Sequence, residues 1–582
     1  MRRTKIVCTI GPSIDSEEKI AEMIEAGMDV ARLNLSHGKR EEHLRRVEMI
    51  REVSRKLKRT IAILVDTRGP EVRTGPLKEE KIILKDGQDF ILTTSAVTGD
   101  QDRVAVTYPG LPRDLAPGRT ILIDDGLLHL EVIEISGDDI LCKVIHGGEL
   151  RSYKGLNLPG TSLSLPALGA EDREDLKLLL EQDIHFIAVS FTRTREDILE
   201  VKRLVEEILP DTLIIAKIES RAGIENFDEI LDVSDGIMVA RGDLGVEIPT
   251  EEVPLLQKKI IYQCNRSGKP VIIATQMLDS MIRHPLPTRA EASDVANAIF
   301  DGTDAVMLSG ETAMGRFPVE AVQTMSRIAR RTEEALRYKQ ILEGLEKVMA
   351  KTVTDAISYA TCHTAQELGA EAIITSTQTG QTARMVSKYR PRSPIVAVTS
   401  RRRVAAQLTL TWGVYPVLCP PVESTDEMFA AATEAALQEQ LVREGSLVVF
   451  TAGVPVGIPG TTNLLRVETI GKVLARGTGL GKSAVTGTAC VVKEMADLDC
   501  LQEGQILVLR SAEKAHLPAL EKAAALITEE GGLTSGGAIL ALNLHKPAVV
   551  GVERALELIK TGELITVDAK RGLIYHGRAN VL

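Results

Sequence analysis

Short runs of apolar and β-branched residues alternate with stretches of helical period through the first third and the middle of the chain. Each run ends in polar residues, and this succession of apolar run, turn and amphipathic stretch is typical of βα units. In residues 41–57, apolar positions recur at steps of three and four, as in a helix that covers a sheet. Those positions are Leu44, Val47, Ile50, Val53 and Leu57. The eight runs are KIVCTI (5–10), VARLNLS (30–36), IAILVDT (61–67), FIAVSFT (186–192), TLIIAKIES (212–220), GIMVARGD (236–243), PVIIATQM (270–277) and AVMLSGE (305–311).

Eight such units are the number that a closed (β/α)8 barrel needs. We therefore predict an α/β protein built on this TIM-barrel architecture. An open, doubly wound sheet shows the same apolar runs, and the pattern favours the barrel without excluding that alternative. The predicted barrel comprises residues 1–73 and 169–342.

Residues 74–168, between the third and fourth runs, change to a period of two. KIILKDGQDFILTT and RTILIDDGLLHLEVIEISGDDILCKVIHGG are typical of strands separated by Asp-Gly and Gly-Asp turns, which predicts hairpins in a small inserted β domain. Because βα loops lie at the catalytic face of a barrel, the insertion is placed to close over a substrate as a lid. A rigid decoration of the barrel is the alternative.

Two further regions follow the barrel. Residues 343–472 begin with a connecting segment and indicate an open α/β sheet. Its apolar runs are AIITST (372–377), IVAVTS (395–400), VYPVLC (414–419) and LVVFTAG (447–453). Residues 473–582 are rich in Gly and Ala, with short runs such as QILVLR and PAVVG, and they predict a compact extra C-terminal domain.

Composition and charge narrow the classes of partner. Of 582 residues, 44% are hydrophobic and 26% are charged, as in ordinary globular proteins. The net charge of -11 gives no general attraction for nucleic acid or anionic lipid, so we expect neither as a partner. The 7 cysteines lack CxxC spacing, which favours a reducing cytoplasm over a disulfide framework or a zinc site. We expect no signal peptide and no membrane span, since the uncharged stretch 405–422 contains polar residues and prolines.

Polar residues gather at the carboxyl ends of the predicted barrel strands, where catalytic side chains of such barrels project. Residues two apart on a strand share a face. Three sets have this spacing: Arg32 with Asn34 and Ser36, Lys217 with Glu219, and Ser309 with Glu311. A buried Arg or Lys requires an anionic partner, bound or built in, because an unpaired buried charge costs several kcal/mol.

Glu219 and Asp243 supply two carboxylates, expected from adjacent strands, that suit one Mg²⁺ or Mn²⁺ ion. A salt bridge among Lys217, Glu219 and Asp243 is the structural alternative. Asn34, Ser36, Asp66 and Thr67 form an all-oxygen set with one charge, which suits a monovalent cation.

Cationic and hydroxyl groups complete the predicted site. Arg32, Arg73 and Lys217 supply donors for phosphoryl oxygens, and Thr275 supplies a hydroxyl. Because no Cys or His nucleophile accompanies them, the set indicates phosphoryl transfer or enolate chemistry. His37 fits a ligand contact or a satisfied loop histidine better than a base.

Six segments in this order closely resemble the motifs of the pyruvate kinase family. They are ARLNLSHG (31–38), DTRGPEVRTG (66–75), KIES (217–220), MVARGDLGVEIP (238–249), ATQMLDSM (274–281) and MLSGETAMGRFP (307–318). The resemblance covers about residues 1–472 and implies a catalytic barrel, a mobile lid and a regulatory α/β domain. It also implies a cytoplasmic homotetrameric phosphotransferase of glycolysis, with phosphoenolpyruvate and ADP as substrates and pyruvate and ATP as products.

The resemblance assigns a role to each candidate residue. It places Mg²⁺ or Mn²⁺ at Glu219 and Asp243, and K⁺ at Asn34, Ser36, Asp66 and Thr67. The implied catalytic residues are Lys217, Thr275, Arg32 and Ser309, and the implied contacts to phosphoenolpyruvate are Arg32, Lys217, Gly242, Asp243 and Thr275. The implied nucleotide contacts are Asn34, His37, Arg73 and Lys154, with Asp124 at the lid hinge.

The resemblance also implies a mechanism. ADP attacks phosphorus in line while Lys217, Arg32 and the cations offset charge on the equatorial oxygens. Pyruvate leaves as an enolate held by the divalent metal, and protonation through Thr275 or a water it orients completes the reaction. Potassium-dependent members carry Glu at the position of Glu71, so we predict potassium dependence.

STQTGQTAR (376–384) follows a predicted strand and opens a helix, so Thr377, Gln378, Thr379, Gly380, Gln381 and Thr382 form a candidate phosphate cradle. A plain Ser/Thr/Gly turn is the alternative. The family binds an effector phosphate in this loop. TAGVPVGIPGTTN (451–463) lacks the Trp and Arg that hold a second phosphate in fructose-1,6-bisphosphate-activated relatives, which favours AMP or a sugar monophosphate as activator.

GGLTSGGAILALNLHKPAVVG (531–551) resembles the swivelling phosphohistidine domain of phosphoenolpyruvate-utilising enzymes. The phosphorylated His would stand at Gly536, so we predict a structural or regulatory domain in which His545 lies at the surface. Two other functions remain as alternatives. A metal-dependent lyase or aldolase of the phosphoenolpyruvate/pyruvate type needs neither ADP nor Arg73, and a scaffold or effector-binding protein needs neither Lys217 nor the metal pair.

Overall fold

The computed structural model describes residues 1–161, 163–346, 352–422, 424–455, 462–471 and 473–581. The chain forms two compact units. The first contains Met1–Met349, Ser387–Arg390 and Arg401–Pro416, and the second contains Ala350–Val386, Pro391–Ser400 and Val417–Leu582. The predicted connecting segment 343–352 and the loop 451–463 lie partly outside the described residues.

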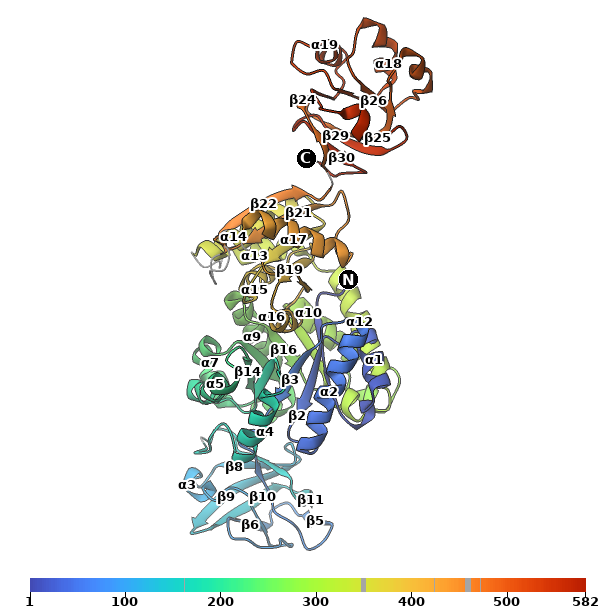
Figure 1. Ribbon diagram of the computed structural model, residues 1–582. Helices are drawn as coiled ribbons and strands as arrows, with labels where there is room; N and C mark the ends of the chain where they lie inside the picture. Colours follow the sequence, from blue (N-terminus) through green and yellow to red (C-terminus); the bar gives the residue numbers. More distant parts are fainter. Residues whose placement is uncertain (162, 347–351, 423, 456–461, 472, 582) are drawn as a thin grey trace. The chain divides into compact units, whose positions relative to one another are not determined.

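Eight parallel strands of the first unit close into a barrel in the order β1-β17-β16-β15-β14-β13-β3-β2 (Figure 1). Their bounds are β1 Lys5–Thr9, β2 Val30–Asn34, β3 Ala62–Asp66, β13 Phe186–Val189, β14 Leu213–Ile218, β15 Gly236–Ala240, β16 Val271–Ala274 and β17 Ala305–Leu308. Each predicted run contains one of these strands. The predicted (β/α)8 barrel is therefore confirmed, and the open sheet is wrong.

Alternate strand residues pack into two separate cores. Val7, Leu64, Phe186, Ile215 and Met307 belong to the cluster inside the barrel. Their strand neighbours face outward and pack under the helices. The helices around the barrel are α1 Glu17–Ala26, α2 Arg40–Leu57, α4 Ala170–Leu180, α5 Arg195–Ile208, α6 Arg221–Glu225, α7 Phe227–Val233, α8 Arg241–Glu247, α9 Val253–Ser267, α10 Arg289–Asp301, α11 Gly310–Ala313 and α12 Pro318–Glu334, followed by α13 Tyr338–Glu346. The predicted helix over 41–57 is α2.

Residues between β3 and β13 form a seven-stranded sheet, β4-β12-β8-β9-β10-β6-β7, and a two-stranded sheet, β11-β5. The strands are β4 Val72–Arg73, β5 Lys81–Leu84, β6 Asp89–Thr93, β7 Arg103–Ala105, β8 Thr120–Ile123, β9 Leu128–Ser136, β10 Asp139–His146, β11 Gly148–Arg151 and β12 Gly155–Asn157, with a short helix α3 Leu111–Asp114.

Two of the hairpins predicted in the insertion are present, because β8 pairs with β9 and β9 pairs with β10 in antiparallel fashion. The hairpin predicted for KIILKDGQDFILTT is wrong. Its two strands lie in different sheets: β5 pairs with β11, whereas β6 pairs with β10 and β7. An Asp-Gly turn reverses the chain locally, but the long strand β10 offers β6 a register of five residue pairs, and this longer pairing prevails.

A five-stranded sheet has the order β20-β19-β18-β21-β22, and the second unit contains β18, β19, β21, β22 and the last two residues of β20. The bounds are β18 Ala372–Ser376, β19 Ile395–Thr399, β20 Val414–Leu418, β21 Leu447–Ala452 and β22 Leu464–Thr469, with helices α14 Val353–Glu367, α15 Gln381–Ser387, α16 Arg402–Leu408 and α17 Thr425–Gln438 along the same stretch of chain. The four predicted runs contain β18 to β21. The antiparallel edge strand β22 has no counterpart in the prediction.

The end of the chain forms an eight-stranded sheet in the order β23-β30-β29-β25-β26-β27-β28-β24. Its elements are β23 Val473–Arg476, β24 Thr478–Leu480, β25 Ala484–Val491, β26 Ile506–Leu509, α18 Leu517–Lys522, β27 Ala525–Thr528, α19 Gly536–Asn543, β28 Ala548–Val550, α20 Ala555–Leu558, β29 Leu564–Asp568 and β30 Leu573–His576. Gly536 is the first residue of α19, and His545 is exposed, as predicted.

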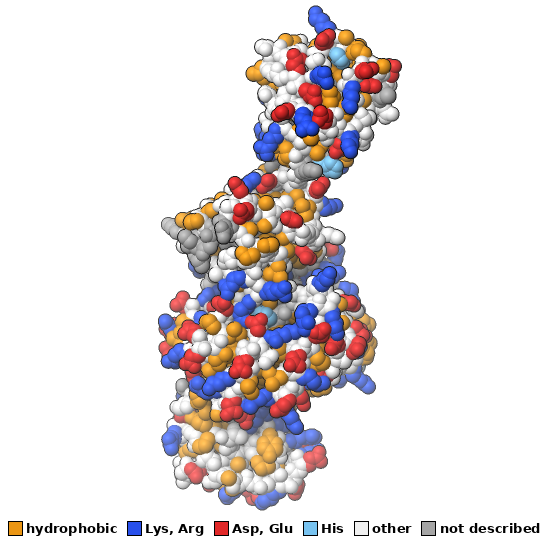
Figure 2. Space-filling view, in the orientation of Figure 1, with side chains coloured by type: hydrophobic (Ala, Val, Ile, Leu, Met, Phe, Trp, Pro, Cys, Tyr) orange, Lys and Arg blue, Asp and Glu red, His pale blue; other side chains and the backbone are white. Residues whose placement is uncertain are grey.

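Charged side chains of both signs are interspersed over the barrel on the face drawn in Figure 2. Among the described residues, no helix has the length and apolar character needed to cross a bilayer.

Candidate active site

Six strand ends present polar side chains to the barrel interior. Inward positions follow a period of two, so the residue two places beyond an interior apolar residue also points inward. The pairs of interior apolar residue and polar strand end are Val7 and Thr9, Val30 and Arg32, Leu64 and Asp66, Ala188 and Ser190, Ile215 and Lys217, and Met307 and Ser309. Because of this two-residue period, these polar groups all lie at one end of the barrel.

Buried ion pairs join the centre of this set. Asp66 is 0% exposed; its Oδ2 accepts from Nε of Arg32 at 2.7 Å, and its Oδ1 lies 3.0 Å from Nζ of Lys217. Nζ of Lys217 also lies 3.1 Å from Oε1 of Glu219 and donates to Oγ of Ser190 at 2.6 Å. Among the ion pairs of the described residues, Lys217 thus uses Asp66 where the sequence suggested Asp243.

The charges in this network support one another. Burial by itself would raise the pKa of Asp66, but the Lys217 ammonium and the Arg32 guanidinium outweigh it and hold that pKa below its ordinary value. Burial likewise opposes the charged form of Lys217, yet the carboxylates of Asp66 and Glu219 raise the pKa of its ammonium. Lys217 is therefore a fixed, desolvated positive charge.

Glu219 and Asp243 differ from Asp66, because nearby cations do not outweigh the effect of burial on their pKa values. Burial raises the pKa of Glu219 to about 7 against the opposing ammonium of Lys217, and nearby Asp243 raises it further. Burial also raises the pKa of Asp243. A buried carboxylate and a partly exposed one in this state fit a divalent cation, which would hold both ionised.

The two carboxylates do not both come from strands, which corrects the sequence prediction. β14 ends at Ile218, one residue before Glu219, and Asp243 lies in the first turn of α8. The described residues hold no cluster of three or more His, Cys, Asp or Glu side chains arranged for a metal ion. A divalent ion here would therefore have two protein carboxylates and take its other ligands from substrate and water, as Mg²⁺ commonly does.

Thr275 lies after β16 in a left-handed conformation, with φ of 66°, and Gln276 follows with φ of 56°. Non-glycine residues are rare in this region and concentrate at functional sites. The hydroxyl of Thr275 accepts from the backbone N–H of Gly242 at 2.7 Å and donates to the carbonyl of Ala274 at 2.7 Å. Thr275 and Gly242 are thus neighbours, and the Gly242 N–H is already hydrogen-bonded to the Thr275 hydroxyl.

Ser309 follows β17, and its buried Oγ has no hydrogen-bond partner among the described residues. Its backbone N–H donates to Oε2 of Glu311 at 2.8 Å, and the N–H of Leu278 donates to Oε1 of Glu311 at 3.0 Å. The predicted shared strand face of Ser309 and Glu311 is wrong, because β17 ends at Leu308 and α11 begins at Gly310. Glu311 supports the loop, whereas Ser309 offers a free hydroxyl.

The oxygen-rich set predicted for a monovalent cation lies on neighbouring strand ends. Asn34 and Asp66 are register partners on β2 and β3. Oδ1 of Asn34 accepts from the N–H of Ser36 at 3.2 Å, and Oγ1 of Thr67 accepts from the N–H of Ser190 at 3.1 Å. β2 ends at Asn34, so Ser36 belongs to a turn and not to the strand face that its spacing suggested.

The predicted nucleotide contacts divide into two places. Arg73 on β4 is the register partner of Gly155 on β12, next to Lys154. Arg73 pairs with Glu71 at 2.5 Å, and Nζ of Lys154 lies 2.9 Å from Oδ1 of Asp124. His37 is exposed, and its carbonyl lies 2.9 Å from Nε2 of His43. Among the described residues, Lys217 makes its hydrogen bond and ion pairs with Ser190, Asp66 and Glu219, and none with Arg73, Lys154 or His37.

The predicted phosphate cradle connects β18 to α15 in the second unit. The N–H of Gly380 donates to the hydroxyl of Thr377 at 2.9 Å, and the hydroxyls of Thr382 and Thr462 lie 3.0 Å apart. Arg384 donates to the carbonyl of Thr379 at 3.1 Å. The loop is therefore shaped by its own hydroxyl groups.

Sequence reasoning missed Thr9, Ser190 and Arg241. Oγ1 of Thr9 accepts from Nη1 of Arg32 at 2.8 Å. Arg241 donates to the carbonyl of Thr275 at 2.8 Å and pairs with Asp294 at 2.7 Å, which fixes the strained loop. Thr9 and Ser190 obey the same period of two as the predicted residues, so the signal that finds them was present in the sequence.

Comparison with protein families divides the chain into three matches. Residues 1–322 match the pyruvate kinase barrel domain, 355–468 match the pyruvate kinase alpha/beta domain, and 501–572 match the mobile domain of PEP-utilising enzymes. The match at 501–572 agrees with the resemblance found around Gly536.

Similar proteins cover the chain from end to end. Pyruvate kinases of Geobacillus stearothermophilus and Bacillus licheniformis are each 52% identical, over 100% of this chain and 100% of theirs. The pyruvate kinase of Staphylococcus aureus strain MRSA252 is 47% identical over the same shares. A crystal structure of a pyruvate kinase from Cryptosporidium parvum, 40% identical, covers 80% of this chain and 96% of its own, with a TM-score of 0.77.

The lyase alternative is not favoured, because these relatives are pyruvate kinases over their whole length. A barrel whose interior ends in a desolvated lysine near two carboxylates that suit a divalent cation is compatible with transfer of a phosphoryl group. With that chemistry and this similarity over its whole length, the chain belongs to the pyruvate kinase family and transfers the phosphoryl group of phosphoenolpyruvate to ADP, giving pyruvate and ATP in glycolysis.

Proposed function

We propose that Lys217 and Arg32 bind the phosphoryl group as it passes between phosphoenolpyruvate and ADP. The observation that carries this assignment is the network in which Asp66 bridges the two cations, at 2.7 Å from Arg32 and 3.0 Å from Lys217. A positive charge held in place before the substrate arrives needs no reorganisation when negative charge spreads over the equatorial oxygens. Ser190 fixes the direction of the Lys217 ammonium.

Glu219 and Asp243 are the proposed ligands of Mg²⁺ or Mn²⁺. The bound divalent ion would supply positive charge that stabilises negative charge developing on substrate oxygens. Two contacts within the chain hold the Glu219 carboxylate. Its Oε2 accepts from the N–H of Phe191 at 2.6 Å, and its Oε1 faces Lys217. These contacts orient one carboxylate, and the first turn of α8 positions the other.

Thr275, Gly242 and Ser309 are the proposed contacts for the rest of phosphoenolpyruvate. The Gly242 N–H now donates to Thr275, so seating the substrate carboxylate requires the Thr275 hydroxyl to turn and release it. The released hydroxyl, or a water it orients, then supplies the proton that the methylene carbon of the enolate needs to become the methyl group of pyruvate. The partnerless Oγ of Ser309 supplies a further hydrogen bond to bound substrate.

K⁺ at Asn34, Ser36, Asp66 and Thr67 is the proposed monovalent cofactor. Arg73, Lys154, His37 and Asn34 are the proposed nucleotide contacts. Glu71 supports potassium dependence because its carboxylate, paired with Arg73 at 2.5 Å, places negative charge where a lysine would place positive charge. We expect ADP phosphates to draw Arg73 and Lys154 away from Glu71 and Asp124.

The loop Thr377–Thr382 is the proposed site of a monophosphate activator, AMP or a sugar monophosphate, which makes the protein an allosteric enzyme. A cytoplasmic homotetramer is the proposed assembly. Both rest on the resemblance to pyruvate kinases, and the loop also has the strand–loop–helix form of a phosphate cradle. The proposed division into 1–73 with 169–342, 74–168, 343–472 and 473–582 rests on the changes of pattern along the chain, with which the resemblance agrees. Sedimentation of the full chain tests the assembly.

Initial rates of pyruvate formation test the cofactor assignments. Phosphoenolpyruvate and Mg²⁺ are supplied with ADP present or absent, and with K⁺ present or replaced by a large organic cation. We expect rapid turnover only with both ADP and K⁺. In Glu71→Lys, turnover should persist when K⁺ is withheld; a variant that still needs K⁺ would contradict the role of Glu71, and wild-type turnover without K⁺ would contradict the potassium site.

A further inference from the structure

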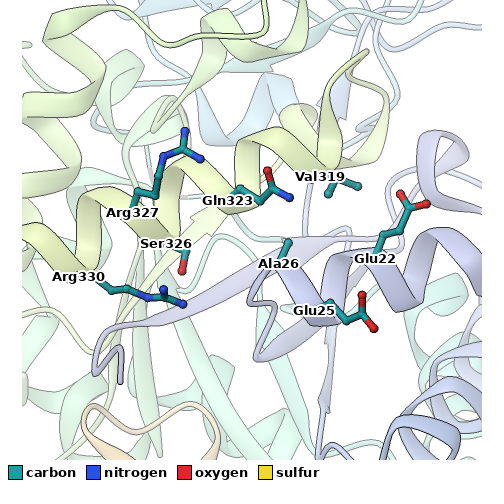
Figure 3. Close-up of a pocket in the computed structure, with 8 residues that line it drawn as sticks. All are labelled: Glu22, Glu25, Ala26, Val319, Gln323, Ser326, Arg327 and Arg330. Carbon is teal, nitrogen blue, oxygen red and sulfur yellow. The ribbon is translucent and has the colours of Figure 1, made fainter.

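A groove of about 510 Å³ lies between two barrel helices, away from the strand ends described above. α12 contributes Val319, Gln323, Ser326, Arg327 and Arg330, and α1 contributes Glu22, Glu25 and Ala26. The α12 residues recur at helical steps of three and four, so they form one stripe, and Figure 3 shows the Glu side chains on the opposite wall.

The floor of the groove contains an unsatisfied hydroxyl. Ser326 is 4% exposed, and its Oγ has no hydrogen-bond partner among the described residues. Nη1 of Arg2, also buried, has none there either. Both atoms lie 3.4 Å from the point that a Cβ on Gly27 would occupy, so a hydroxyl and a cation converge on one small space. Buried polar groups are rarely left unpaired without a reason.

The two walls differ in chemistry. Arg327 and Arg330 are exposed cations that follow Ser326 by one and four residues on α12, and Arg327 donates to Oγ1 of Thr324 at 2.7 Å. Glu22 and Glu25 are exposed carboxylates on α1, and Glu22 pairs with Lys19 at 2.7 Å. Guanidinium groups beside a hydroxyl suit the oxygens of a phosphate, and carboxylates accept hydrogen bonds from hydroxyl groups. The volume admits a small metabolite and is too small for a macromolecular segment of any length.

We propose that this groove binds a small phosphate monoester that carries several hydroxyl groups, such as a sugar phosphate. Its phosphate lies against Ser326, Arg327 and Arg330, and its hydroxyl groups lie against Glu22 and Glu25. The site belongs to the barrel and shares no residue with the active site or with the loop Thr377–Thr382. It is therefore an additional ligand site, independent of the roles proposed above.

Calorimetric titration of the full chain with glucose 6-phosphate tests the proposal, with glucose and inorganic phosphate as probes of each half of the ligand. Because the active site and the effector loop also bind phosphates, the quantity compared is the number of sites and the affinity of each. We expect Arg327→Gln and Arg330→Gln each to weaken one class of site by about tenfold or more, the usual effect of one charge-assisted hydrogen bond. Arg331→Gln, on the same helix but outside the groove, is the control and should change nothing.

Ser326→Ala separates a ligand role from a structural one. Since the hydroxyl has no partner, its removal should leave the thermal stability of the free protein unchanged or higher, yet weaken the same class of site. Glu25→Gln should weaken glucose 6-phosphate and strengthen inorganic phosphate, because a phosphate alone meets only the repulsion of the carboxylate. Hydrogen exchange should slow in α1 and α12 when glucose 6-phosphate is added.

Three results would overturn the proposal. One is an unchanged number and affinity of sites in the Arg327 and Arg330 variants. Another is an equal loss in the Arg331 control, which would indicate general surface charge. The third is protection from exchange that is confined to residues outside α1 and α12. Circular dichroism of each variant verifies that the barrel is folded.

Discussion

The barrel and the C-terminal region 473–582 both resemble domains that handle phosphoenolpyruvate, and both place a turn between a strand and a helix where the chemistry would occur. In the barrel, polar side chains at several strand ends pair with one another, among them Arg32, Asp66 and Lys217. In the C-terminal region, α19 begins with Gly536 in place of the resembled histidine. The two regions therefore differ in whether the position that the resemblance assigns to chemistry carries a reactive side chain.

The geometry at Gly536 is as informative as the residue type. A Cβ built on Gly536 would overlap the carbonyl oxygen of Ala512. The backbone has therefore closed over the position, and a single substitution cannot restore a reactive imidazole there. At the barrel strand ends, by contrast, Lys217 pairs with both Asp66 and Glu219.

Lys217→Met should have the largest effect on the barrel side of this comparison. The substitution removes the fixed positive charge and leaves Asp66 and Glu219 without it, so kcat for phosphoryl transfer should fall by at least about a hundredfold, the scale of one preorganised donor. Steady-state rates with saturating substrates and cations measure this.

Lys202→Met provides the matched control, because Lys202 lies on α5 and its ammonium makes a long ion pair of 3.7 Å with Asp235. Its rate should equal that of the unmodified protein. Near-normal turnover in Lys217→Met would contradict the role proposed for Lys217. The contrast between the barrel and the C-terminal region would then no longer rest on this residue.

Gly536→His tests the other side of the comparison. The new side chain must displace the backbone at Ala512, so we expect α19 to lose about 1–3 kcal/mol of stability, the usual cost of forcing atoms into a packed site. Hydrogen exchange of the α19 amides measures this. Incubation with labelled phosphoenolpyruvate should give no acid-labile phosphate on the substituted side chain, and pyruvate formation should be unchanged. Labelling of that side chain would show that the domain retains phosphoryl-transfer chemistry.

Ser190→Ala sharpens the barrel half of the comparison, since Ser190 positions Lys217 and is not expected to touch substrate. Losing the 2.6 Å hydrogen bond should lower kcat by about tenfold, equivalent to about 1.4 kcal/mol, with little change in KM. The unchanged KM separates positioning from binding. A rise in KM with constant kcat would instead place Ser190 among the substrate contacts.

The sequence was sufficient to predict the barrel strands and the inward direction of several site residues, because the period of two determines which face of a strand a residue occupies. Val30 and Arg32, or Ile215 and Lys217, are related by that rule alone. The rule failed where strands end early: Glu219, Asp243 and Glu311 lie in turns or helices, and their positions depend on how those loops fold back. It also failed for KIILKDGQDFILTT, because strand pairing is decided by distant partners such as β10 and not by the local Asp-Gly turn.

Interactions across elements were beyond the reach of sequence patterns for the same reason. Nothing in the spacing indicates that Arg241 reaches Thr275, or that the Gly242 N–H is taken by the Thr275 hydroxyl. The pairing of Lys217 with Asp66 is likewise a contact between strands far apart in the chain. Spacing predicts which face a side chain occupies, and only the three-dimensional structure identifies its partner.

Helix capping gives the smallest expected effect and the closest test of what the two regions share. Ser535 caps α19 by accepting from the N–H of Ala538 at 3.3 Å, and Thr194 caps α5 by accepting from that of Asp197 at 3.4 Å. Ser535→Ala and Thr194→Ala should each cost about 1 kcal/mol, read from exchange of the capped helix, with no change in pyruvate formation. Thr534→Ala, which removes an exposed neighbouring hydroxyl, is the control. Equal costs would mean that the C-terminal region is held together as firmly as the barrel and differs from it only in chemistry, whereas a negligible cost for Ser535→Ala would mean that its scaffold, too, has loosened.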